Sequence, residues 1–71
     1  MVGRTSLTAR EQEIAALIAE GLSNQQIGLR LFISENTVKK HVKGIFQEMG
    51  VSNRHQLMAE LYRTAAIVVD A

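Results

Sequence analysis

The stretch SENTVKKHVKGIFQEMG, residues 34–50, decides how the rest of the chain is arranged. Its apolar residues recur at i, i+4, i+7, i+8 and i+11, the spacing of one continuous stripe on an α-helix. They are Val38, Val42, Ile45, Phe46 and Met49. Ser34 is suited to cap the first backbone N–H groups, and Gly50 is suited to the left-handed position that follows a helix. We therefore predict a helix over residues 34–49 with this stripe buried.

The opposite face of this helix is polar and basic. It carries Asn36, Lys40, Lys43 and Gln47, with Lys39 on its flank, and no acid lies among them. A basic face is usually only a solvated face. Its neighbours in the sequence therefore decide how it is interpreted.

A second helical pattern, SNQQIGLRL at residues 23–31, precedes the first and is separated from it by Phe32 and Ile33. Two helices joined so closely must cross at a sharp angle. This is the helix-turn-helix arrangement, in which the second helix enters the major groove of DNA and the first lies across the backbone. In that arrangement the lysine face would meet DNA.

Size and composition limit the remaining choices. The chain has 71 residues, 46% hydrophobic residues and no cysteine, which predicts one small domain without disulfides or thiolate zinc sites. We assign residues 7–71 to this domain and residues 1–6, which show no periodicity, to a flexible lead-in or linker end. The longest apolar runs are only a few residues, so we expect no membrane segment and a soluble, cytoplasmic protein.

Charge is concentrated on the helix pair. The net charge of the chain is only +1. Residues 21–47, however, hold Arg30, Lys39, Lys40 and Lys43 against the single acid Glu35, a net charge of +3. The segments on either side each carry a net negative charge. This distribution is typical of a surface that faces phosphates.

Two further helices complete a predicted all-α, four-helix bundle-like domain. One spans residues 8–20, with Thr8 and Glu11 as a capping box; the other spans residues 53–66, with Asn53 and Gln56 as another. Ser23 and Gln26 suit a third box at the start of the helix over residues 23–31. The last helix also has three apolar residues outside its inward stripe: Ala59, Tyr62 and Ala66. We predict that they form a homodimer contact; the alternative is partial burial in the monomer. Gly28, inside the second helix, either admits a neighbouring helix or is simply tolerated.

Four segments, LTAREQEI, GLSNQQIG, LFISENTVKKHVKGIFQEMGV and SNRHQL, together resemble the LuxR-type (FixJ- or GerE-type) DNA-binding domain of bacterial transcription regulators. The similarity covers residues 7 to about 62. Sigma-factor DNA-binding regions share the LTxRE and TVK elements but continue differently where this chain has KKHVKGIFQEMGV. Gly28 departs from the alanine common in the family, which bears on stability alone.

The resemblance implies that the third helix reads the major groove and the fourth forms a homodimer. It implies base or adjacent phosphate contacts for Lys39, Lys40 and Lys43, and backbone contacts for a second set: Ser23, Asn24, Gln25, Asn36, Thr37 and His41. Arg10 lies where another backbone contact is plausible. The alternatives are a local capping bond for Thr37, ordinary surface polarity for the amides, and a packed role for His41. Full-length relatives usually carry an upstream receiver or ligand-binding domain, and stand-alone members exist.

The first hypothesis is therefore sequence-specific binding of double-stranded DNA by a dimeric regulator, either as its output domain or as a stand-alone protein. The alternative is a helical interaction module whose lysines meet an acidic partner, for example RNA polymerase. An enzyme is the weakest class, because no Ser/His/acid set, glycine-rich phosphate loop or metal spacing occurs. We expect no cofactor and no metal. Glu11 and Arg54 are interpreted as structural residues that cap and bridge, and Arg63 as a solvated charge.

Overall fold

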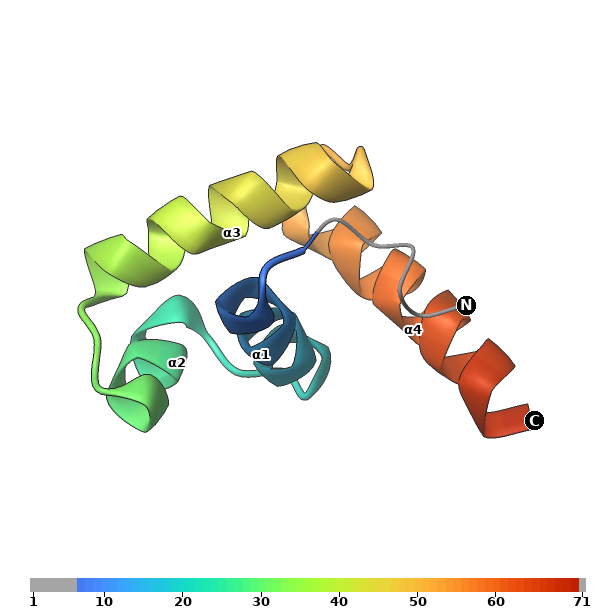
Figure 1. Ribbon diagram of the computed structural model, residues 1–71, viewed down its shortest axis with the longest axis horizontal. Coiled ribbons are helices and arrows are strands. Elements are labelled where there is room, and N and C mark those ends of the chain that lie inside the picture. The colour runs from blue at the N-terminus through green and yellow to red at the C-terminus, as the bar shows by residue number, and fades with distance from the viewer. Residues whose placement is uncertain (1–6, 71) are drawn as a thin grey trace.

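The computed structural model describes residues 7–70, and side chains through residue 63. In this range it contains α1 (Ala9–Ala19), α2 (Asn24–Leu31), α3 (Glu35–Met49) and α4 (Arg54–Asp70). Figure 1 shows α3 lying across α1 and α2, while α4 turns back from the far end of α3 along the other side of α1. The predicted all-α class and the order of the helices are confirmed.

Each of the first three helices begins directly after the residue that was predicted to cap it. The Thr8 hydroxyl accepts a hydrogen bond from the Glu11 N–H at 3.1 Å, and the Glu11 carboxylate accepts from the Thr8 N–H at 3.0 Å. Ser23 and Gln26 form the same reciprocal pair at the start of α2. Ser34 accepts from the Thr37 N–H at 3.0 Å. These bonds satisfy backbone donors that a helix start otherwise leaves unpaired.

The fourth helix departs from the prediction at both ends. Asn53 does cap it, accepting from the Gln56 N–H at 2.9 Å, but the Gln56 side chain accepts from the Ser52 N–H at 2.7 Å instead of closing a capping box with Asn53. α4 also continues to Asp70, beyond the predicted end at residue 66. No glycine or proline interrupts residues 64–70, so no local stop signal ends the helix there.

All four helices contribute to one core. α1 and α3 supply most of its fully buried side chains, while α2 and α4 each add a single large one; the buried apolar residues are Ile14, Ala15, Ile18, Ile27, Val38, Val42, Ile45 and Leu57. The remaining members of the predicted α3 stripe, Phe46 and Met49, are partly buried and pack against this core. Burial of each large side chain contributes about 1.5–3 kcal/mol. The inward face of α3 is therefore determined, and so is its outward face.

The turn between α2 and α3 sets how these two helices cross. Phe32 ends α2 in a left-handed conformation, with φ at 61°, and the Ile33 N–H donates to the Gly28 carbonyl at 3.0 Å. A Cβ on Gly28 would lie 2.7 Å from the Ile33 carbonyl oxygen and 3.5 Å from the Glu35 nitrogen. Gly28 thus admits the backbone of the turn and of the start of α3, where a neighbouring helix had been expected. An alanine at this position would require the turn to shift.

Candidate nucleic-acid interface

The outward face of α3 is exposed along its length. Every residue of the predicted set is exposed: Asn36, Lys39, Lys40, Lys43 and Gln47. The acids Glu35 and Glu48, near the two ends of α3, are exposed as well. No hydrogen bond or ion pair within the described residues involves the side chain of any of the three lysines. Because the opposite stripe is held in the core, these ammonium groups remain available to an anionic ligand.

Several arginines are placed differently. Arg10 forms an ion pair with Glu13 at 3.6 Å on α1, and Arg63 pairs with Glu60 on α4. The prediction that Arg63 is a solvated charge is therefore incomplete, because this exposed side chain also has a partner one turn before it. Arg10 and Arg63 are thus each partly neutralised by an acid on their own helix. The lysines of α3 are not.

One flank of the lysine face borders an open groove between α3 and the starts of α2 and α4. Its floor is apolar, from Val42 and Phe46, and its rim is polar and basic; the rim residues are Asn24, Lys39, Lys43, Ser52, Asn53 and Arg54. The lining contains no acid. The structure therefore brings Asn24 together with two of the predicted lysines, whereas Lys40 lies outside this groove.

Arg54 connects the elements around the groove. Its Nη1 donates to Asn24 Oδ1 at 2.8 Å, and its Nη2 donates to the backbone carbonyl of Leu22. This confirms the bridging role predicted for Arg54. Sequence reasoning did not place Ser52, Asn53 or Arg54 beside the lysines, because it treated them only as the turn and cap before α4.

The other predicted backbone-contacting residues lie outside the groove lining. Ser23, Gln25 and Asn36 are exposed, while Thr37 and His41 are half-buried. The hydroxyls of Thr37 and Ser34 lie 2.9 Å apart, so the local capping bond considered as the alternative for Thr37 is present. All five lie on α2, on α3 or at their starts, on the elements that carry the lysines and Asn24.

The predicted dimer contact lies on α4. Ala59 is exposed, and Tyr62 is 70% exposed, one of the large apolar side chains that the fold leaves open. The side chain of Ala66 lies outside the described residues. This exposure is what a docking contact requires.

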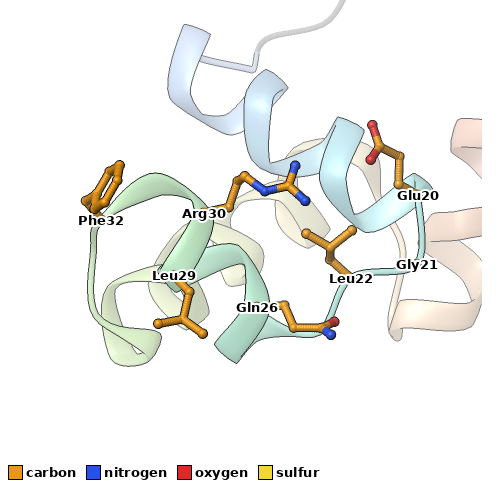
Figure 2. A pocket seen from close by; sticks show the side chains of 7 residues that line it. All are labelled: Glu20, Gly21, Leu22, Gln26, Leu29, Arg30 and Phe32. Atoms are coloured by element: carbon orange, nitrogen blue, oxygen red, sulfur yellow. The ribbon is translucent and has the colours of Figure 1, made fainter.

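A second hollow lies between α1 and α2, away from the α3 groove. Its lining residues are Glu20, Gly21, Leu22, Gln26, Leu29, Arg30 and Phe32. Figure 2 shows Arg30 pointing toward the end of α1 that carries Glu20, whereas the Phe32 ring points away from the other side chains. Leu29 is 73% exposed and Phe32 is 94% exposed. The sequence signal for this patch was Leu29, an apolar residue outside the inward stripe of Ile27 and Leu31.

Neither a metal-ligand cluster nor a membrane-spanning helix occurs in the described range. Among residues 7–70, no group of three His, Cys, Asp or Glu side chains is placed to hold a metal ion. None of the described helices combines the length and the apolar character needed to cross a bilayer.

The sequence of the chain is similar to those of bacterial regulatory proteins. A family model described as "Bacterial regulatory proteins, luxR family" matches residues 5–61. The probable transcriptional regulatory protein SgaR of Hyphomicrobium methylovorum is 52% identical over 54 residues, which cover 76% of this chain and 26% of SgaR. The spore germination protein GerE of Bacillus subtilis (strain 168) is 40% identical over 57 residues, covering 80% of this chain and 77% of GerE.

Solved structures agree with these sequence matches. Transcription factor GerE superposes with a TM-score of 0.74 at 42% identity, covering 87% of this chain and 92% of that one. The response regulator ChrA of a heme-sensing two-component system superposes with a TM-score of 0.78, also at 42% identity, covering 87% of this chain and 31% of ChrA. The chain thus spans about a quarter of SgaR and about a third of ChrA, but most of GerE.

Proposed function

The chain belongs to the luxR family of bacterial regulatory proteins, and we propose that it functions in transcription regulation by binding double-stranded DNA sequence-specifically with α3 in the major groove. The observation that carries this proposal is the α3 face, on which Lys39, Lys40 and Lys43 are exposed and unpaired within the described residues. The 15 residues of α3 span about 22 Å, enough to cross a major groove about 12 Å wide.

Contacts divide into two kinds. Lys39, Lys40 and Lys43 would contact base edges or the phosphates beside them, since lysine can donate to guanine O6 and N7 as well as to phosphate. The residues at the starts of α2 and α3, with His41, would hold the DNA backbone; they are Ser23, Asn24, Gln25, Asn36 and Thr37. Phosphate contacts would supply most of the affinity, and base contacts the specificity.

A homodimer through α4 would pair two such helices on adjacent half-sites. Support comes from the exposure of Tyr62 and Ala59 on a helix that does not carry the lysine face. Dimeric helix-turn-helix proteins bind half-sites about one helical turn apart, so the geometry of α4 would set the spacing of the operator.

The chain would act either as the output domain of a longer regulator or as a stand-alone regulator. SgaR and ChrA, of which the chain covers 26% and 31%, favour the first arrangement, with an upstream regulatory domain; GerE, of which it covers 77%, favours the second. In either case the ligand would be chromosomal DNA, which lies in the bacterial cytoplasm, and RNA polymerase would be the partner through which transcription changes.

The test is selection from a pool of random duplex DNA at two salt concentrations, followed by sequencing of the retained fraction. Enrichment of a short motif, especially a paired one, is the expected result. Salt-sensitive retention without an enriched motif would mean that the α3 face binds anions in general and does not read a DNA sequence. No retention would refute DNA binding and favour the alternative of a helical module that binds an acidic protein partner.

A further inference from the structure

The groove beside α3 contains a contact that the lysines alone do not explain. Arg54, the first residue of α4, donates to the Asn24 side chain at 2.8 Å and to the Leu22 carbonyl. Asn24 is the first residue of α2, so one guanidinium joins the starts of two helices that lie 30 residues apart in the sequence. This contact links the position of Asn24 to α4.

The contact also determines which end of the Asn24 amide is free. A guanidinium has only donors, so Asn24 must turn its oxygen toward Arg54 and its nitrogen elsewhere. The Asn24 Nδ2 makes no hydrogen bond within the described residues. Because no buried side-chain nitrogen or oxygen in that range lacks a partner, Nδ2 must reach solvent. Arg54 therefore leaves Asn24 as an exposed donor.

The surroundings of this donor suit a phosphate. Asn24 shares the groove lining with Lys39, Lys43 and Arg54, and the lining contains no acid. Two ammonium groups beside an amide donor match the acceptor oxygens and the negative charge of a backbone phosphate. A cationic ligand would be repelled by these ammonium groups.

We propose that Arg54 is a positioning residue that turns the Asn24 amide so that Nδ2 donates to one backbone phosphate of the bound DNA, beside Lys39 and Lys43. The inference rests on the proposed function, because the phosphate belongs to the DNA that α3 binds. Arg54 acts through Asn24, while its Nη1 and Nη2 donate to Asn24 and to the Leu22 carbonyl.

The experiment uses the duplex obtained by selection, with each phosphate in turn replaced by an uncharged methylphosphonate. For the wild-type chain, neutralising the phosphate held by Asn24 is expected to weaken binding about tenfold, as for a hydrogen bond to a charged group together with the lysine contacts. In Asn24→Ala the same replacement should weaken DNA binding only about threefold, because the lysine contacts remain.

Arg54→Lys separates positioning from simple stabilisation. Lysine keeps the positive charge, but its single ammonium lacks the planar fork that holds Asn24 and Leu22 together. We expect the loss at this phosphate to fall to about threefold, as in Asn24→Ala, with the overall salt dependence unchanged. If Arg54 only stabilised the fold, Arg54→Lys would lower the unfolding midpoint, but neutralising this phosphate would still weaken DNA binding about tenfold. Gln47→Ala, which removes an exposed α3 amide outside the groove, is the control in which the tenfold loss should persist.

Each outcome bears on the proposal separately. If Asn24→Ala removes the effect and Arg54→Lys keeps it, Arg54 does not position the amide. If neutralising each phosphate weakens DNA binding by the same factor in Asn24→Ala as in the wild type, Asn24 contacts no phosphate. A wild-type chain that does not bind duplex DNA would instead overturn the proposed function, and this result is visible before any phosphate is replaced.

Discussion

Replacing Lys39, Lys40 and Lys43 together by alanine should remove a defined part of the salt dependence of DNA binding. All three side chains are exposed and unpaired within the described residues, so the change breaks no internal side-chain hydrogen bond or ion pair there. Alanine is also the strongest helix former, so α3 should persist. Each lysine that neutralises a phosphate contributes about −0.9 to the slope of log Kobs against log salt, so the three contribute up to about −2.7.

Fluorescence anisotropy with a labelled duplex measures this slope. Raising the salt from about 50 mM to about 200 mM should weaken wild-type binding by up to about 40-fold more than it weakens binding of the triple variant. Circular dichroism of the variant should retain the wild-type helix content. Arg63→Gln removes an exposed cation from α4 and should leave the slope unchanged. A triple variant with the wild-type slope would show that the outward face of α3 does not meet DNA.

Two further predictions concern side chains that the fold leaves open. Tyr62→Glu should weaken dimerisation and the cooperativity of operator binding, measured by sedimentation equilibrium and by titration of a two-half-site duplex, while Arg63→Gln, with the same change of charge at the next residue, should not. Unchanged dimerisation in Tyr62→Glu would show that Tyr62 is not part of the dimer contact. Phe32→Asn should raise the unfolding free energy by up to about 1 kcal/mol in urea denaturation, because Phe32 is 94% exposed at a φ of 61° and asparagine tolerates that region better. A loss above about 1 kcal/mol would mean that the Phe32 ring packs against the protein.

Helix starts and inward stripes were predictable because both depend on neighbours along the chain. Thr8, Ser23 and Ser34 cap their helices as expected, since a capping side chain reaches only two or three residues ahead. Asn53 obeyed the same rule, but Gln56 had two donors within reach and bonded the Ser52 N–H. Its choice between these partners depends on how the turn before α4 is folded.

The sequence alone determined the lysine face. Once spacing places Val38, Val42 and Ile45 in the core, the geometry of a helix puts Lys39, Lys40 and Lys43 outside. The family resemblance pointed to the same residues. Which of them contacts a base and which a phosphate stays a prediction.

Only the tertiary structure decided what lies beside that face. Arg54 meets Asn24 across 30 residues of sequence, and the Ile33 carbonyl packs on Gly28 through a left-handed Phe32. These contacts join helices whose relative placement comes from packing of the shared core. A periodic pattern reports which face of a helix is buried, but it does not report which residue of another helix that face will meet.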